Sequence, residues 1–283
     1  MSDGFTLGLF YTIVRPEEKS LLAAAEGRGL SVERWDDDHL TFGLGKPPNL
    51  PDVVLNRSVS HTRALYAAWC FDHYGVPAVS ASEVLALAGD KVRTSLRLAD
   101  RGIPTPRTEV ALSTEAGMKA IESIGYPAVL KPAVGSWGRL MAKVDSPESA
   151  QQVLEHKEAL GAPLHSVIYV QEYIPKPDRD LRVFVVGDHA LAAMYRRSSD
   201  WRTNAARGAT TDPCPITDEL GELAVRAAHA VGGGVLAVDL MESPRGLLVH
   251  EVNPTPEFKA LTATTGVDIA GAIVDHAVEV GRR

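Results

Sequence analysis

Two carboxylates and an amide, Asp239, Glu251 and Asn253, lie within two runs of sequence that are mostly apolar and typical of strands. The stretch GVLAVDLMESPRGLLVHEVNPT, residues 234–255, predicts two strands joined by the turn SPRG. If the hairpin is centred near Arg245, Asp239 lies opposite Glu251, and Asn253 shares a face with Glu251 because it is two positions away. Two carboxylates and an amide oxygen suit Mg²⁺, and an ionised carboxylate in an apolar strand needs a cation nearby. The stretch therefore predicts a magnesium site; the alternative is an amphipathic hairpin with its polar residues in solvent.

A lysine at the end of another apolar run precedes a loop that contains glycine. Lys131 closes the run AVLKP, and the loop after it contains, in order, Gly135, Ser136, Trp137, Gly138 and Arg139. Such loops expose backbone N–H groups, which suit phosphate oxygens. The loop matches neither the GxxxxGK[ST] nor the GxGxxG motif, so an anion-binding loop of another kind is predicted. The simpler interpretation is an edge lysine whose stem covers apolar surface beside an ordinary turn.

Two further segments could contact a nucleotide. Lys91 begins an expected helix, where a cation opposes the helix dipole, so an anion is predicted nearby. The segment YVQEYIPKPDRDLRVFVV, residues 169–186, joins two strands through a proline-rich bend and could present backbone groups to a purine edge. The alternative is an ordinary strand–loop–strand with a surface ion pair. The candidates for cofactor contact in this segment are Gln171, Glu172, Tyr173, Ile174, Asp178 and Arg182.

Arginines gather in one short run of this acidic chain. The run YRRSSDWRTNAARG, residues 195–208, contains Arg196, Arg207 and Asn204. Guanidinium groups bind phosphate and carboxylate through paired hydrogen bonds, so an anion site is predicted; the alternative is a solvated loop. Upstream, Arg57 and Ser58 follow an expected strand, at the end where α/β sheets place their ligands.

The elements that must position these residues fall into three blocks. Strands alternate with helices over residues 1–88, which predicts a parallel α/β N-terminal domain. Residues 89–166 are typical of a small mixed α/β unit. Residues 167–283 contain strands joined by short turns and two helices, which predicts an antiparallel α+β block.

Composition limits the classes of function. The chain has 283 residues and a net charge of −7, which argues against nucleic acid as a partner. Its two cysteines form no CxxC motif, which argues against a zinc site. The N-terminus lacks a signal-peptide pattern, and no segment approaches about 18 consecutive apolar residues, so we expect a cytoplasmic enzyme without a membrane partner. The sequence is compatible with a homo-oligomer.

Taken together, these segments resemble the ATP-grasp superfamily. The resemblance rests on Lys91, VLKP with Lys131, GSWGR, QEYI, Asp239 and EVNPTPEFK, and it covers nearly the whole chain. Within the superfamily, the chain is similar to the carboxylate–amine ligases that act on an amino-group carrier protein in lysine and arginine biosynthesis, the LysX and ArgX type. The RimK type is a more distant likeness. The resemblance implies a three-domain fold: an N-terminal α/β domain, a small central lid domain and a C-terminal antiparallel α+β domain.

The resemblance also implies a reaction. ATP and one or two Mg²⁺ ions are expected between the central and C-terminal domains. Lys91 and Lys131 would contact the phosphates, the GSWGR loop would close over them, and residues 171–174 would hold the adenine. Asp239, Glu251 and Asn253 would hold the metal. ATP would phosphorylate the C-terminal glutamate of a small acidic carrier protein, and the α-amino group of 2-aminoadipate or glutamate would attack the acyl phosphate.

The last group of candidates concerns the substrates. Arg196, Asn204 and Arg207 are the expected catalytic residues, placed to contact the acyl phosphate and the amino-acid carboxylates. The residues expected to bind substrate are Arg57, Ser58, Arg196, Asn204, Thr255, Glu257 and Phe258. The segment after Asn253 varies within the resembled family, so the amino acid stays open. The alternatives are a RimK-like ligase acting on another protein tail and a non-catalytic ATP-binding module.

Overall fold

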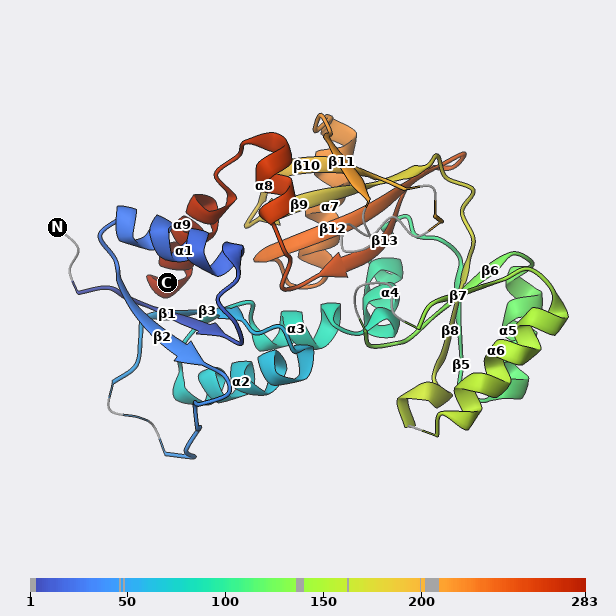
Figure 1. The fold of residues 1–283 in the computed structure, drawn as a ribbon, viewed down its shortest axis with the longest axis horizontal. Coiled ribbons are helices and arrows are strands. Elements are labelled where there is room, and N and C mark those ends of the chain that lie inside the picture. Colours follow the sequence, from blue (N-terminus) through green and yellow to red (C-terminus); the bar gives the residue numbers. More distant parts are fainter. Residues whose placement is uncertain are drawn as a thin grey trace.

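Three sheets form the framework of the molecule, which is described by a computed structural model (Figure 1). The structure describes residues 4–45, 47, 49–135, 140–161, 163–198, 200–201 and 209–283. The sheet orders are β2-β1-β3-β4, β5-β8-β6-β7 and β11-β10-β9-β12-β13. In Figure 1 the first sheet lies at the left, the five-stranded sheet near the centre and the remaining sheet at the right.

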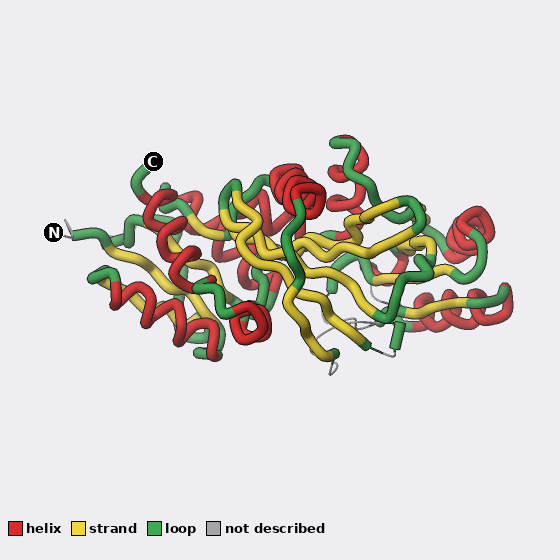
Figure 2. The backbone as a smooth tube through the Cα atoms, turned by 90° about the horizontal axis from the view of Figure 1, so that it is seen from above, coloured by secondary structure: helices red, strands yellow, loops and turns green. Residues whose placement is uncertain are grey.

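The N-terminal sheet is parallel, as its alternating sequence pattern predicts. Its strands are β1 (Thr6–Tyr11), β2 (Ser31–Asp36), β3 (Val53–Arg57) and β4 (Ala78–Val79). Its helices are α1 (Pro16–Gly27), α2 (His61–Tyr74) and α3 (Ser82–Ala88). Helix α2 starts where Ser60 accepts a hydrogen bond from the backbone of Arg63, and it ends at Gly75 in the left-handed conformation. Helices lie on both sides of these strands (Figure 2).

Helix α9 (Ile269–Gly281) completes the N-terminal unit although it lies far along the chain. It packs against α1 and β3, and Ile273 and Val274 share a core with Leu7 and Leu55. The N-terminal unit is therefore built from two distant parts of the sequence.

The central sheet is antiparallel and includes a strand that the sequence analysis placed elsewhere. Its strands are β5 (Thr108–Ala111), β6 (Ala128–Lys131), β7 (Ala142–Val144) and β8 (Ile168–Glu172), and its helices are α5 (Thr114–Ile124), α6 (Pro147–Ala159) and η1 (Pro163–Ser166). Strand β8 pairs with β5 and β6, so the expected division at residue 166 separates strands that bond to one another. The hydrophobic run predicts a strand, but its partners are distant in sequence. We propose that the central domain extends through β8.

The C-terminal sheet is antiparallel. Its strands are β9 (Arg179–Val186), β10 (His189–Arg197), β11 (Thr210–Pro213), β12 (Val235–Ser243) and β13 (Gly246–Asn253), and its helices are α7 (Asp218–Ala230) and α8 (Lys259–Thr265). Successive residues of β9 point to opposite faces: Val183 packs with α7, whereas Phe184 packs with α8 and α9. Helix α4 (Lys91–Asp100), expected in the central unit, instead packs against α7 and β13 through Leu98. None of the helices in the described ranges has the length and apolarity that a membrane span needs.

A close approach in the N-terminal sheet gives a test of this packing. A Cβ atom added at Gly8 would lie 2.9 Å from Cγ of Pro51 and 3.1 Å from Cγ2 of Val54. We expect Gly8→Ala to lower the free energy of unfolding by about 1–3 kcal/mol, because the proline ring cannot turn aside. Urea unfolding measures the change. Gly27→Ala is the matched control, since its Cβ would meet no atom within 4 Å; equal stabilities for the two variants would contradict the packing.

Candidate functional site

A cleft of about 220 Å³ is lined by residues from all three units. From the N-terminal unit come Arg15, Ser58, Val59 and His61, and from the start of α4 comes Lys91. The central unit contributes Val134 and Gly135, which follow β6. The C-terminal sheet and the segment after it contribute Arg182, Arg196, Glu251, Asn253, Pro254, Thr255, Pro256 and Glu257.

Two of the lining residues, Arg182 and Arg196, belong to a buried cluster of ion pairs. Asp239 is 1% exposed and lies beside Arg182 in the β9–β12 pairing. Its Oδ1 accepts a hydrogen bond from Nε of Arg182 at 2.7 Å, and its Oδ2 accepts one from Nη2 of Arg182 at 2.8 Å. Nη2 of Arg196 lies 3.2 Å from the same Oδ2. Burial alone would raise the pKa of Asp239, but the two guanidinium groups outweigh burial and hold it well below its ordinary value.

Arg196 is fixed from both sides. Its Nε and Nη2 donate to the two carboxylate oxygens of Asp180 at 2.7 and 2.8 Å, in addition to its contact with Asp239. Burial would lower the pKa of Arg196, but Asp239 and Asp180 raise it above the ordinary value, so the guanidinium stays charged. The sequence predicts an arginine that is available to anions; the structure gives one that lines the cleft while two carboxylates hold it.

Glu251 lies on β13, close to Lys91. It pairs across the hairpin with Asp239, as predicted, although the pairing depends on a bulge between Asp239 and Leu240 that shifts the register by one residue. Its Oε1 is 3.2 Å from Nζ of Lys91, which also donates to the carbonyl oxygen of Gly135 at 2.7 Å. Asn253 donates through Nδ2 to Oδ2 of Asp239 at 3.3 Å. The three proposed metal ligands therefore lie together.

Lys131 is buried at the end of β6 and is only 4% exposed. Its Nζ donates to Oε1 of Gln171 at 2.6 Å, and Nε2 of Gln171 donates to the hydroxyl of Tyr169 at 3.0 Å. Burial lowers the pKa of Lys131 to about 8, while the charge of Glu251 acts in the opposite direction. Gln171, predicted as an adenine contact, thus holds this lysine through its side chain.

The rest of the predicted adenine segment is engaged with neighbouring residues. Oε1 of Glu172 accepts a hydrogen bond from the backbone of Arg107 at 2.6 Å and forms a close ion pair with Arg245. Lys143 lies over the ring of Tyr173, with Nζ 4.9 Å from the ring centre. Ile174 is buried and Asp178 is exposed.

The predicted substrate residues divide into two groups. Ser58, Thr255 and Glu257 line the cleft. Arg57 and Phe258 are buried, at 4% and 2% exposure, and do not belong to the lining. The residues Ser136, Trp137, Gly138, Arg139, Asn204 and Arg207 lie outside the described residues.

Two polar residues of the lining, Arg15 and His61, were not predicted from the sequence. Arg15 follows β1, as Ser58 follows β3, and His61 begins α2. Parallel strands bring their carboxyl ends to one edge of a sheet, so Arg15 could have been found by the same rule that selected Ser58. His61 could have been found by its place beside Ser58 in the segment NRSVSHTR.

The chain matches two families of domains. Residues 88–277 match the RimK-like ATP-grasp domain, and residues 7–87 match the LysX preATP-grasp domain. The alpha-aminoadipate–LysW ligase LysX of Saccharolobus solfataricus is 35% identical, over 94% of this chain and 98% of the relative. The glutamate–LysW ligase ArgX of Sulfurisphaera tokodaii is 34% identical, over 96% of this chain and 97% of the relative.

Solved structures share the whole architecture. A RimK domain ATP-grasp protein from Sphaerobacter thermophilus superposes with a TM-score of 0.79 at 25% identity, covering 96% of this chain and 99% of that chain. The ATP-grasp ligase PsnB, solved with a minimal precursor, Mg and ADP, superposes with a TM-score of 0.75 at 19% identity, covering 97% of each chain. The arrangement of sheets described above is thus the ATP-grasp fold.

The buried lysine predicts a pH dependence of stability. The pKa of Lys131 is about 8 in the folded chain against an ordinary value of 10.5, so the unfolded chain binds more protons between these values and stability rises with pH there. We expect the free energy of unfolding of the native chain, measured relative to that of Lys131→Met, to increase by about 1 kcal/mol between pH 8 and pH 9. Urea unfolding at both pH values measures this difference, and a difference that does not change with pH would contradict it.

Proposed function

The chain belongs to the RimK-like ATP-grasp family, and on that premise we propose that it is an ATP-dependent carboxylate–amine ligase. Its substrates would be the C-terminal glutamate carboxylate of a small acidic amino-group carrier protein and the α-amino group of an amino dicarboxylate, 2-aminoadipate or glutamate. Support comes from two relatives named as LysW ligases, each matched over nearly its full length. The observation that carries the proposal is the ion pair of Lys91 and Glu251 in the cleft, with the buried Lys131 close enough to both for their charges to act on its pKa.

The reaction proceeds in two steps. A carboxylate oxygen of the carrier takes the γ-phosphoryl group of ATP, which gives an acyl phosphate and ADP. The amine nitrogen then attacks the acyl carbon, the C–N bond forms, phosphate leaves with the C–O bond electrons, and the nitrogen loses its proton. Phosphoryl transfer depends on positioning and on neutralising negative charge more than on a protein nucleophile.

The described residues supply positive charge from several directions. Lys91 and Lys131 would contact the phosphates, because one lines the cleft and the other ends the strand beneath it. Arg196 and Arg182 line the cleft while Asp239 holds them, so their positions change little when a ligand arrives. Arg196 would face the acyl phosphate. Arg15 lines the cleft near Glu257 and is a candidate for a substrate carboxylate.

The proposed metal ligands fit a hard divalent cation. They offer two carboxylates and one amide, and the amide nitrogen of Asn253 is turned to Asp239, which leaves its oxygen for a cation. Both oxygens of Asp239 already accept hydrogen bonds from Arg182. Glu251 and Asn253 therefore have more lone pairs available to coordinate a metal ion than Asp239 has. A bound Mg²⁺ would neutralise charge on the phosphate oxygens.

An amino-acid panel tests the function directly. The chain is incubated with ATP, Mg²⁺ and a small acidic carrier that ends in glutamate, together with 2-aminoadipate, glutamate, aspartate or lysine in separate reactions. We expect ADP release and a carrier mass increase of one amino-acid residue with 2-aminoadipate or glutamate. ADP release at background with every carrier and amino acid would overturn the proposal. A mass increase on another protein tail alone would favour the RimK-like alternative.

A matched pair of variants tests the metal site. Glu251→Gln removes one negative charge from the cleft, and we expect turnover to fall by about 100-fold or more while the melting temperature stays close to that of the native chain. Glu242→Gln is the control, because Glu242 lies on the same hairpin and pairs with Arg179 outside the cleft. The control should keep near-native turnover. Near-native turnover of Glu251→Gln would remove Glu251 from the site.

A further inference from the structure

The loop from Pro254 to Lys259 connects β13 to α8 and forms one wall of the cleft. It follows Asn253 directly. Pro254 and Pro256 restrict its backbone, so few conformations are open to it. The loop carries Thr255 and Glu257, the two candidates for contact with the amino acid that line the cleft beside it.

Residues of the N-terminal unit hold this loop at successive positions. Ser80 donates through its hydroxyl to the carbonyl oxygen of Pro254. Nη1 of Arg57 donates to the carbonyl oxygen of Pro256 at 3.1 Å, and Cζ of Arg57 lies 5.7 Å from the ring centre of Phe258. These contacts join segments about 170–200 residues apart in sequence.

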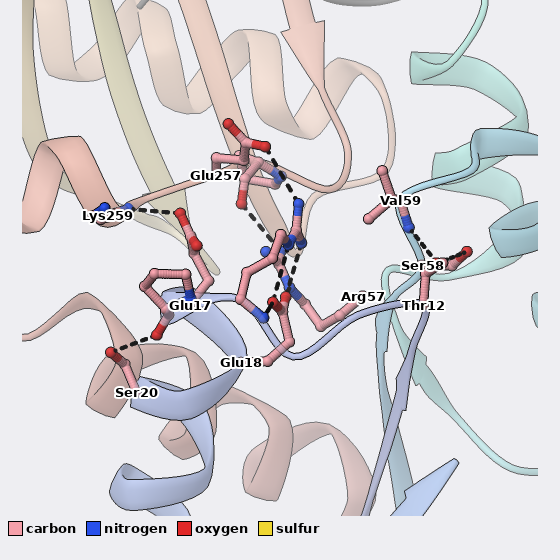
Figure 3. Close-up of polar contacts among 12 residues, drawn as sticks. Thr12, Glu17, Glu18, Ser20, Arg57, Ser58, Val59, Glu257 and Lys259 are labelled. Atoms are coloured by element: carbon pink, nitrogen blue, oxygen red, sulfur yellow. Dashed lines mark hydrogen bonds and ion pairs between the residues drawn. The ribbon is translucent and has the colours of Figure 1, made fainter. Parts of the chain in front are cut away.

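The start of α1 holds the far end of the loop (Figure 3). Arg15 pairs with Glu257, with Nη1 3.3 Å from Oε1. Oε1 of Glu17 accepts a hydrogen bond from the backbone N–H of Lys259 at 3.1 Å, which satisfies a donor at the beginning of α8. The loop is therefore attached to the N-terminal unit from Pro254 to Lys259.

Glu18 is the centre of this arrangement. Its side chain is fully buried, and it accepts hydrogen bonds from Nε of Arg15 at 3.0 Å, from Nη2 of Arg15 at 2.8 Å and from Nε of Arg57 at 3.2 Å. One carboxylate thus orients both arginines that reach the loop. Arg57 is itself buried, and its Nη2 has no hydrogen-bond partner among the described residues, so Glu18 is its compensating charge.

We propose that Glu18 and Arg57 are positioning residues for the amine substrate: they hold the Pro254–Lys259 loop in the conformation that accepts the amino acid, without touching the amino acid themselves. The proposal rests on the ligase function proposed above. It places part of the determinant of amino-acid selectivity in the N-terminal unit, outside the ATP-grasp domain. The clamp consists of Arg15, Glu17, Glu18, Arg57 and Ser80. The side chains proposed above for ATP and metal, Lys91, Lys131, Glu251 and Asn253, lie on α4, β6 and β13.

Steady-state kinetics of clamp variants test the role. For Glu18→Gln, which keeps the shape and removes the charge, we expect the KM for the amino acid to rise 10-fold or more while the KM for ATP stays within twofold. Ser80→Ala, which removes one hydroxyl, should give a smaller rise in the same KM. Asp275→Asn is the matched control: Asp275 pairs with Arg28 and also ties α1 to α9, but it lies away from the loop. Its amino-acid KM should equal that of the native chain.

Two further measurements separate positioning from stability. Removing one partner of a buried ion pair is more damaging than replacing both, so Glu18→Gln/Arg57→Gln should melt closer to the native chain than Arg57→Gln alone. Its amino-acid KM should nevertheless stay raised, because the bond to Pro256 is lost. Recovery of the KM together with stability would overturn the positioning role.

Amide hydrogen exchange gives a readout that needs no substrate. Exchange in a peptide covering residues 254–262 should be faster in Glu18→Gln than in the native chain, and unchanged in Asp275→Asn. Unchanged exchange in Glu18→Gln would overturn the clamp, and faster exchange with a native KM would overturn its role in substrate binding. If the native chain turned over no amino acid, the proposed function would fail, and the exchange data alone would still decide whether the clamp holds the loop.

Discussion

The pairing of Asp239 with Arg182 and Arg196 is the constraint on which the site depends. Three strands, β9, β10 and β12, contribute to it, and Asp180 adds a second carboxylate. Leaving any one of these charges unpaired in the interior would cost about 3–5 kcal/mol, so the four side chains hold one another in place. The cluster presents two charged guanidinium groups to the cleft and also keeps Asp239 ionised beside Glu251. The proposed cation site and the proposed anion site thus depend on the same buried ion pairs.

Lys91 and Lys131 are positioned by the packing of separate units against one another, and not by the buried ion pairs of Asp239. Lys91 comes from a helix that packs on the C-terminal sheet, and Lys131 comes from a strand of the central sheet. Their meeting near Glu251 requires the central unit to sit over the C-terminal sheet, and the contact of Lys91 with Gly135 joins the two. The N-terminal unit contacts the Pro254–Lys259 loop through the clamp, on the side of the cleft proposed for the amine. Residues of all three units line the cleft, so in the proposed function each unit contributes one part of the chemistry.

The sequence predicted features that depend on residues close together in the chain, such as the hairpin of β12 and β13. The turn SPRG predicts a hairpin that brings Asp239 and Glu251 close together. The turn pairs Ser243 with Gly246, and a bulge between Asp239 and Leu240 then shifts the register by one residue, so that Asp239 lies opposite Glu251 and not His250. The neighbours of Asp239 on its other side could not be predicted, because β9 and β12 pair across more than fifty residues. For the same reason the sequence pattern did not reveal that β8 pairs with β5 and β6, or which residues are the partners of Arg196. Arg57 was correctly placed at a strand end, but the loop that covers it arrives from the far end of the chain.

Helix α9 closes the N-terminal unit although it is translated long after α1 and β3. On the ribosome, the apolar surface formed by Leu7, Leu21 and Leu55 stays uncovered until this last helix has left the exit tunnel. The core around β1 and β3 is therefore incomplete until α9 has been synthesised, and a nascent chain that stalls before α9 exposes apolar surface to chaperones and proteases.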